Sequence, residues 1–412
     1  MRAVHVLRKW DRAEWGGTET AMERMFEGLS EQGVDAVLYC PRLDHRREEA
    51  EAPQIRRFRA FVPILGISRQ RRRQMVSVGG NLMSFDLASS LWREREAAII
   101  HTHTLGRIGS IARVVARRRR VPFVVAIHGG VLDLPQKIRQ AFNAPVVGSF
   151  EWGKIFGWLL GARHLFRDAD CIITCNEKEA ALLRKRYKRV FVQAHGVPVE
   201  LYQKNHRQAA RVALPRIVGR RMLLCVGRVD PIKNQHWLLD QAPAIFQKHP
   251  DAILVLAGPC TDEPYGELVG RKIKELGLQD RVLLTGGFPP NDPVLIGLLQ
   301  EAAAVLLPSL SETFGLVILE AWAAGAVVLS SRTSGPSALI RHGENGWLFD
   351  LDEPGCFHSA LDHALRDATR ARGMASLGAV VSQRHSLKSV ASSLKSLYEE
   401  LIQENNALRN SA

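Results

Sequence analysis

The chain has 412 residues with a formal net charge of +14, and 46% of its residues are hydrophobic while 24% are charged. This length exceeds one compact core and suits two α/β domains, and the composition is that of an ordinary globular protein. No apolar run reaches the roughly 18 residues that a membrane span requires. Because Arg2 begins a predicted strand, we expect no signal peptide. The six scattered cysteines favour free thiols in a reducing, cytoplasmic compartment.

Apolar, strand-like runs alternate with helical segments along the whole chain, which is typical of parallel sheets. The first half contains six such runs, at 2–7, 34–40, 97–103, 122–128, 171–175 and 189–195. The second half contains six more, at 222–227, 252–258, 281–286, 303–309, 326–331 and 346–349. Between the halves, the polar segment 198–215 predicts a turn-rich hinge, and the amphipathic segment Leu387 to Leu408 predicts a final helix.

Two cations follow the first strand of the second half. The segment Leu223 to Asn234 (LLCVGRVDPIKN) predicts a buried strand and a glycine turn, then Arg228 and Lys233 on either side of an Asp230–Pro231 turn. Ligands of open α/β sheets bind beyond the carboxyl ends of the strands, where both cations are expected. Arginine offers a planar fork and lysine a mobile point charge, a pair that suits a diphosphate. This segment alone supports ordinary surface cations about equally well.

Two acidic residues flank a predicted helix start further along the chain. In Ser309 to Gly325 (SLSETFGLVILEAWAAG), seven residues separate Glu312 from Glu320. We expect Glu312 on a strand-to-helix loop and Glu320 about two turns further on, with the carboxylates on the order of 10 Å apart. The helix start between them offers free N–H groups and a positive dipole end, which suit a phosphate. Hydroxyl groups at each end with an anion between them are the layout of a nucleotide sugar.

Each acid also has an ordinary explanation. A glutamate in an amphipathic helix is usually solvated, and Glu312 could be an acid that the dipole of the helix start favours. The combination of a buried strand, a loop acid, a glycine and an acid within an apolar helix favours a ligand site, with Glu320 as its second acid.

These motifs resemble the second domain of the family 4 retaining glycosyltransferases, which have the GT-B architecture. The resemblance runs from Leu223 to Phe349 and extends more weakly to Trp15–Cys40, to Val124–Gly130 and to the last strands of the first half. It implies two Rossmann-like, doubly wound parallel-sheet domains that face each other across a cleft, with a C-terminal helix crossing back to the first domain. The expected domains are an acceptor-side domain at 1–200 plus 386–412 and a donor-binding domain at 201–385.

The resemblance also implies roles for the matching residues. Glu312 would contact sugar hydroxyls near the reacting carbon, Glu320 would accept from the ribose hydroxyls, and Arg228 and Lys233 would hold the diphosphate. His128 would lie at the acceptor side and complete the predicted catalytic set with Glu312, Arg228 and Lys233. The other donor contacts would come from Gly16, Gly17, Phe314, Gly315, the backbone N–H groups of Leu316 and Val317, and, for the base, the loop Thr285–Phe288.

No carboxylate cluster of the DxD type accompanies these residues, so the two cations would replace a metal ion in neutralising the leaving phosphate. We therefore expect no metal and no cofactor, and a UDP- or GDP-linked sugar as the donor substrate. His101 and His103 alternate at a strand end. They could form a metal pair, but a hydrogen-bonded polar strand end is the favoured interpretation.

Basic residues gather in the first half of the chain. Arginine clusters and nearby apolar stretches occur at 69–73, 117–120, 58–68 and 150–161. Because Trp152, Phe156 and Trp158 lie beside basic residues, this pattern suits peripheral contact with an anionic membrane. Packing of Phe156, Leu159 and Leu160 in the core is at least as well supported. No nucleic-acid module accompanies the clusters, so nucleic acid is not an expected partner.

We predict a cytoplasmic, metal-independent, retaining hexosyltransferase that serves cell-surface polysaccharide biosynthesis, with a lipid-linked or growing glycan as acceptor. In this family, retention is pictured as a front-face displacement assisted by the leaving phosphate. Two alternatives stay open, namely a nucleotide-sugar epimerase or hydrolase of the same fold, and a non-catalytic basic adaptor for membrane or nucleic acid. Ala338 and His195 stand where the family usually has glutamate and asparagine, so the subfamily is left undetermined. The sequence does not name the sugar, the base or the acceptor.

Overall fold

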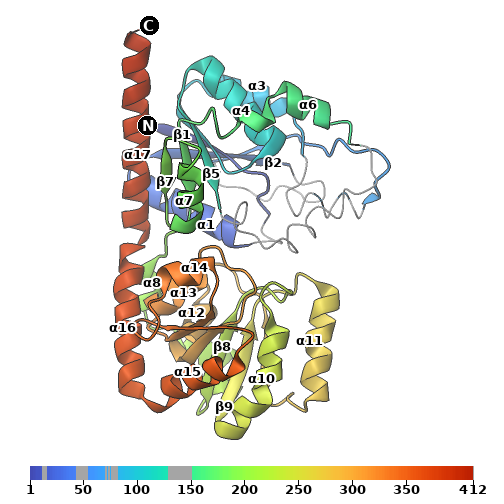
Figure 1. The fold of residues 1–412 in the computed structure, drawn as a ribbon, viewed down its shortest axis with the longest axis vertical. Coiled ribbons are helices and arrows are strands. Elements are labelled where there is room, and N and C mark those ends of the chain that lie inside the picture. Colours follow the sequence, from blue (N-terminus) through green and yellow to red (C-terminus); the bar gives the residue numbers. More distant parts are fainter. Residues whose placement is uncertain are drawn as a thin grey trace. The chain divides into compact units, whose positions relative to one another are not determined.

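The computed structural model describes residues 1–11, 16–42, 54–69, 72, 75, 82–128 and 151–411. The chain forms two compact units, a first unit made of Met1–Ala194 with Lys388–Ala412 and a second unit made of His195–Leu387 (Figure 1). Each unit is built on one sheet, with strands in the order β3-β2-β1-β4-β5-β6-β7 in the first and β10-β9-β8-β11-β12-β13 in the second. All strand pairs among the described residues are parallel, which confirms the predicted α/β class.

The sheet of the first unit contains the six predicted strands and one that was missed. Its strands are β1 (Arg2–Val6), β2 (Asp35–Pro41), β3 (Ile55–Phe58), β4 (Ala97–Thr102), β5 (Phe123–Ile127), β6 (Cys171–Thr174) and β7 (Val190–Val192). The unpredicted strand is β3. It lies at the edge of the sheet and carries two arginines in four residues, so it lacks the apolar run by which buried parallel strands are recognised.

Helices cover both faces of this sheet, and the last of them confirms the predicted return of the C-terminus. The helices are α1 (Gly17–Glu31), α3 (Asp86–Arg93), α4 (Gly106–Arg119), α6 (Lys154–Leu159), α7 (Glu177–Arg184) and α17 (Leu387–Asn410). Along α17, the buried residues Ala391, Leu394 and Tyr398 recur at helical spacing. They pack with Ala3 of β1 and Val124 of β5 in one core cluster.

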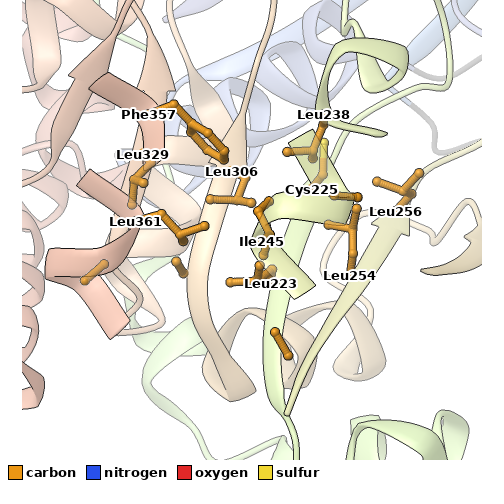
Figure 2. Packing of buried hydrophobic residues seen from close by; sticks show 14 of the residues in the cluster. Leu223, Cys225, Leu238, Ile245, Leu254, Leu256, Leu306, Leu329, Phe357 and Leu361 are labelled. Carbon is orange, nitrogen blue, oxygen red and sulfur yellow. The ribbon is translucent and has the colours of Figure 1, made fainter. Parts of the chain in front are cut away.

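In the second unit all six predicted strands form. They are β8 (Arg221–Val226), β9 (Ala252–Ala257), β10 (Val282–Gly286), β11 (Ala302–Leu307), β12 (Val328–Ser331) and β13 (Trp347–Phe349). The helices that follow β8 in this unit are α10 (Gln235–Lys248), α11 (Glu263–Glu275), α12 (Pro293–Glu301), α13 (Leu316–Ala323), α14 (Ser334–Leu339), α15 (Pro354–Arg366) and α16 (Ala368–Arg384). Figure 2 shows how Leu223, Leu254 and Leu306 of the central strands meet Ile245 of α10 and Leu361 of α15 in a common core.

The predicted hinge at 198–215 is wrong, because this segment is helical and packs within the second unit. It forms α8 (Val199–Gln203) and α9 (Arg207–Ala213). A Cβ on Gly297 of α12 would lie 2.2 Å from the carbonyl oxygen of His206, so the absence of a side chain lets α9 approach α12 closely. Gln300 then accepts a hydrogen bond from the His206 N–H at 2.8 Å. The polar residues that suggested turns lie on the exposed faces of these short helices.

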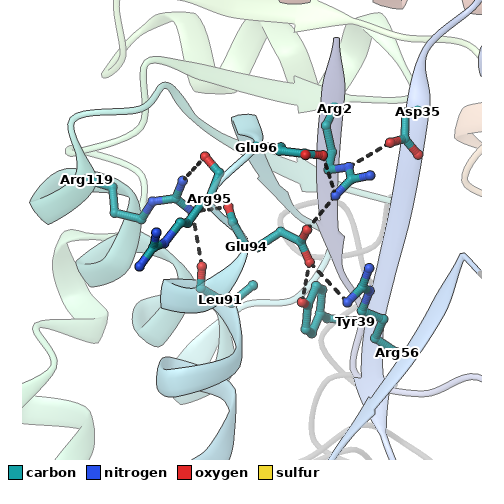
Figure 3. Close-up of polar contacts among 9 residues, drawn as sticks. All are labelled: Arg2, Asp35, Tyr39, Arg56, Leu91, Glu94, Arg95, Glu96 and Arg119. Atoms are coloured by element: carbon teal, nitrogen blue, oxygen red, sulfur yellow. Dashed lines mark hydrogen bonds and ion pairs between the residues drawn. The ribbon is translucent and has the colours of Figure 1, made fainter.

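An ion-pair network centred on Glu94, which lies just before β4, links three other strands of the first sheet (Figure 3). Glu94, which is only 6% exposed, binds Arg2 of β1 at 2.9 Å and accepts from the Tyr39 hydroxyl at 2.7 Å. Arg56 adds a third contact to the same carboxylate at 3.6 Å, and Arg119 donates to the Glu94 carbonyl at 2.7 Å. Burial and the bond to Glu94 together raise the pKa of Tyr39. The network thus connects β1, β2 and β3 to the segment before β4.

We expect Glu94→Gln to lower the free energy of unfolding by about 2 kcal/mol, since one buried carboxylate serves several donors. Denaturant unfolding followed by circular dichroism measures the change. Glu96→Gln is the matched control, because Glu96 also binds Arg2 but is 73% exposed, and its loss should cost less than about 0.5 kcal/mol. Equal losses of unfolding free energy in the two variants would show that the buried carboxylate of Glu94 stabilises the fold no more than the exposed carboxylate of Glu96.

Candidate active site

The loop after β8 carries the first part of the candidate site. Asp230 is 6% exposed and organises this loop from within. Its Oδ1 accepts from the Lys233 N–H at 2.9 Å, and its Oδ2 binds the Arg228 guanidinium at 2.9 Å. The turn at Asp230–Pro231 therefore exists as predicted and leads into α10, which begins at Gln235. Through Asp230, this turn holds the backbone of Lys233 and the guanidinium of Arg228, the two cations predicted to bind the diphosphate.

Lys233 reaches across to Glu312 on the loop after β11. The Lys233 Nζ and Glu312 Oε2 are 2.5 Å apart, and the two side chains are 20% and 22% exposed. Burial acts to lower the pKa of Lys233, but the charge and hydrogen bond of Glu312 outweigh it, and the net pKa is raised. For Glu312, burial acts to raise the pKa, but Lys233 and the N–H groups of Phe314 and Gly315 outweigh it, and the net pKa is lowered. Both groups are therefore charged at neutral pH.

Two glycines shape the turn between Glu312 and α13. Gly315 caps the helix with a φ of 97°, a conformation that strains any residue with a side chain. Gly335, at the start of α14, donates its N–H to the Glu312 carbonyl at 2.8 Å. A Cβ on Gly335 would lie 2.5 Å from the Phe314 nitrogen, so α14 can press against this turn only because Gly335 has no side chain.

The remaining predicted donor residues lie along the first turns of α13. Leu316 and Val317 occupy the first two positions of the helix, where backbone N–H groups have no acceptor within the helix. Glu320 is the fifth residue of the helix, about one turn beyond its start, and is 7% exposed. The second unit thus brings together Arg228, Lys233, Glu312, Phe314, Gly315, Leu316, Val317 and Glu320 at the carboxyl edge of its sheet. Their contact with a donor stays a prediction.

Three predicted site residues lie in the first unit, at the carboxyl edge of its sheet. Gly16 caps α1 and Gly17 begins it. Gly16 has ordinary extended dihedrals, and a Cβ there would meet the Glu19 carboxylate at 3.1 Å. His128 directly follows β5, and its Nε2 lies 2.8 Å from the Nδ1 of His103. Burial, followed by the charge of Arg8, lowers the pKa of His128 to about 4, so this imidazole is neutral at pH 7. Two ends of the predicted motifs, Trp15 and Gly130, lie outside the described residues.

A cationic pocket of about 290 Å³, which the sequence did not reveal, lies beside the N-terminus of α4. Arg8, Lys154 and Arg107 contribute positive charge to its lining, and Glu151 contributes one negative charge, which is paired with Arg107. Arg107 is held in place by Glu151 at 2.8 Å. Because Gly106 begins α4, the partial positive charge of the helix start adds to that of the side chains. The pocket is therefore suited to an anionic group, and its residues are too far apart in the sequence to form a recognisable motif.

The predicted basic membrane surface is only partly exposed. In the cluster 117–120, Arg117 binds Asp168 at 2.6 Å, and Arg119 donates to the carbonyls of the segment 91–95, so these two arginines have structural roles. The cluster 69–73 lies partly outside the described residues. In the stretch 58–68 the structure buries Phe58, Val62 and Ile64 completely or nearly so.

The aromatic stretch on α6 has one buried and one exposed side. Phe156 and Leu160 pack against the core of the first unit, as the alternative interpretation expected. That interpretation is wrong for Leu159, which is 64% exposed beside Trp158 at 68% and Ile155 at 63%. Among the described residues, no helix is both long and apolar enough to cross a membrane. The three exposed apolar side chains of α6, Ile155, Trp158 and Leu159, therefore lie on the surface of the first unit.

Comparison with family models assigns both halves of the chain. Residues 16–200 match the glycosyl transferase 4-like domain, and residues 206–378 match the glycosyl transferases group 1. The chain belongs to the GT-B glycosyltransferases. The second match contains every residue of the Lys233–Glu312 site, and the first contains Gly16, Gly17 and His128.

Curated relatives of this glycosyltransferase have 25–30% sequence identity to it. The D-inositol 3-phosphate glycosyltransferase of Corynebacterium urealyticum is 30% identical over 247 residues, which cover 57% of each chain. The protein of the same name from Corynebacterium glutamicum is 25% identical over 357 residues, which cover 84% of this chain and 81% of the relative. With the C. urealyticum protein and several further relatives, the match spans less than two thirds of the relative's length.

Solved structures share its fold over nearly the whole chain. Anabaena Alr3699/HepE in complex with UDP and glucose superposes with a TM-score of 0.72 at 19% identity, covering 97% of this chain and 99% of that one. The sucrose-phosphate synthase of Thermosynechococcus elongatus superposes with a TM-score of 0.73 at 19% identity, covering 98% and 99%. These likenesses confirm the predicted GT-B fold.

The pKa shifts of the central ion pair predict how stability depends on pH. Since the folded-state pKa of Glu312 lies below its usual 4.5, the pair stabilises the protein above that value and loses its contribution as the pH falls further. The unfolding temperature of Glu312→Gln should lie below that of the parent from pH 6 to 8, and the gap should narrow below about pH 4.5. Glu344→Gln, which removes an exposed acid of the same unit, should show no pH-dependent gap. A constant gap for Glu312→Gln down to pH 3.5 would contradict the assignment.

Proposed function

We propose that this glycosyltransferase takes its sugar from a nucleotide diphosphate sugar that binds at the carboxyl edge of the second sheet. The observation that carries the proposal is the Lys233–Glu312 ion pair beside the N-terminus of α13. It brings one cation and one carboxylate from two loops to the helix start with its free backbone N–H groups, and these are the groups that a sugar diphosphate requires. The binding of UDP and of UDP-glucose by Anabaena Alr3699/HepE supports this donor class.

In this proposal the ion pair opens when the donor binds. A diphosphate carries more negative charge than one carboxylate, so it competes with Glu312 for Lys233. Arg228, which is 44% exposed, and the N–H groups of Leu316 and Val317 would share the phosphate oxygens. Glu312, released from Lys233, would accept hydrogen bonds from the sugar hydroxyls, and Glu320 would accept from the ribose. The base would lie against the loop Thr285–Phe288.

We further propose that transfer retains the anomeric configuration and needs no metal at the diphosphate. Lys233, Arg228 and the helix start would stabilise the charge that develops on the leaving phosphate, which is the part a metal ion plays in other enzymes. The leaving phosphate would accept the proton of the acceptor hydroxyl on the face where the new bond forms. An epimerase or hydrolase with the same donor site would instead release a free sugar or an isomerised donor without an acceptor.

For the acceptor we propose a lipid-linked or cell-surface glycan precursor bound by the first unit, on the side of His128. A phosphorylated polyol is a second candidate, which the cationic pocket of Arg8, Arg107 and Lys154 favours. The name of the curated relatives, D-inositol 3-phosphate glycosyltransferase, supports this second candidate. A mixture of nucleotide sugars tested with and without each acceptor class would separate the two.

The variant Lys233→Ala tests the donor site directly. We expect it to fold normally and to lose roughly 100-fold in kcat/KM, because one charge-stabilising group is removed from the leaving phosphate. Affinity for nucleoside diphosphate, measured by calorimetry, should fall as well. Lys274→Ala, which removes an exposed cation of α11 in the same unit, should behave like the parent. Unchanged nucleoside diphosphate affinity in Lys233→Ala would refute the assignment of this residue.

The exposed side of α6 supports peripheral contact with an anionic membrane, the location proposed for a lipid-linked acceptor. Trp158→Ser should weaken binding to anionic vesicles by at least roughly tenfold, because burying a large apolar side chain contributes about 1.5–3 kcal/mol. Leu377→Ser is the matched control, since Leu377 is 53% exposed but lies on α16 of the second unit. Binding should fall as salt shortens the Debye length towards ~3 Å. Equal cosedimentation of the parent with neutral and anionic vesicles would rule out an electrostatic contribution.

A further inference from the structure

Strand register brings three histidines together in the interior of the first unit. His5 on β1 lies directly opposite His101 on β4, because the two strands pair in parallel with these residues in register. His103 follows β4 and is fixed by its own N–H, which donates to the Val6 carbonyl at 2.8 Å. The residues are 0%, 1% and 7% exposed, respectively. Adjacent strands thus hold three imidazoles in one enclosed space.

The rings are close enough to share a ligand. The Nδ1 of His5 lies 2.9 Å from the Nε2 of His103, and the centroids of the His101 and His103 rings are 4.1 Å apart. One ring nitrogen from each of the three residues can be chosen so that all three lie within 4.8 Å of one another. Zinc binds imidazole nitrogen at about 2.0–2.1 Å, so small side-chain shifts would bring all three to one ion.

Two buried nitrogen atoms in this cluster lack a partner. Within the described part of the chain, neither the Nε2 of His5 nor that of His101 has a hydrogen-bond partner. A buried polar atom without a partner is unusual, because it loses its hydration without replacement. A cation bound between the rings would satisfy the Nε2 of His101, and it would replace the hydrogen bond between the Nδ1 of His5 and the Nε2 of His103.

The outer contacts of the cluster match those of metal-binding histidines. A ligating imidazole usually bonds through its second nitrogen to a neighbouring group that fixes its orientation. The second nitrogen of His101, Nδ1, lies 2.6 Å from the Tyr398 hydroxyl of α17, and the Nδ1 of His103 lies 2.8 Å from His128. The Nε2 atoms of His101 and His103 therefore point away from Tyr398 and His128, respectively.

We propose that His5, His101 and His103 form a binding site for one transition-metal ion of the zinc class. Sets of imidazole ligands suit zinc, copper and nickel, and disfavour magnesium and calcium, which prefer oxygen. The ion would join β1 to β4 at the carboxyl edge of the first sheet and, through His103, would fix the orientation of His128. This site is distinct from the residues proposed to hold the diphosphate, and its test does not depend on transferase activity.

Zinc binding to the full-length, tag-free protein tests the site. After dialysis against EDTA and reconstitution with zinc chloride, we expect about one ion per chain by elemental analysis after gel filtration. The unfolding temperature should rise by roughly 5 °C at a zinc concentration a hundredfold above Kd. His101→Gln should lose both effects. His164→Gln, which removes a less buried histidine of the same unit, should retain both.

Tyr398→Phe supplies a readout that survives if the histidine variants fail to fold. Because it removes only the hydroxyl that orients His101, it should keep the fold and weaken zinc affinity by roughly 10-fold or more. A folded parent that binds no zinc would overturn the proposal. So would equal zinc affinity in the parent and in Tyr398→Phe together with a folded, zinc-binding His101→Gln.

Discussion

Parallel strand pairing is the constraint on which both units depend. In a parallel sheet the carboxyl ends of all strands emerge at the same edge, and the crossover helices return the chain to the other edge. In the second unit, the loops after β8 and β11 share that edge and carry Lys233 and Glu312. The corresponding edge of the first unit carries His103 and His128. Residues that lie far apart in the sequence therefore become neighbours through topology.

The loops that carry Lys233 and Glu312 can stay in place while the ion pair between the two side chains opens for a ligand. Charges that are about one fifth exposed lose part of their hydration, so neither group would be stable in this place without the other. Asp230 fixes the lysine loop and Gly335 fixes the glutamate loop, each through a backbone hydrogen bond. The loops are thus held by bonds that an incoming anion would not break, and only the contact between the two side chains has to change.

The two ends of the strands in the first sheet differ in the charge of their buried polar groups. Near the amino ends of β1 and β4, the full charges of Arg2 and Glu94 are paired, and Arg56 of β3 adds a further contact to the same carboxylate. At the carboxyl edge, buried imidazoles are held neutral, because the interior disfavours their charged form. Neutral, hydrogen-bonded rings can accept a ligand without first giving up an ion pair. This difference explains why the candidate sites of this unit gather at one edge, while the other edge serves stability.

The amino-acid sequence by itself determined the alternation of strands and helices, because strands buried on both faces, such as β8 and β11, must be continuous apolar runs. It also identified the loop cations, the two acids and the returning C-terminal helix from local pattern and family resemblance. It failed at β3 and at α8 and α9, whose short, charged segments carry no periodic apolar signal. Only the tertiary structure paired Lys233 with Glu312, across 79 residues, and set His5 opposite His101. Those contacts depend on strand register and loop direction, which arise from packing between distant segments and leave no mark in the local sequence.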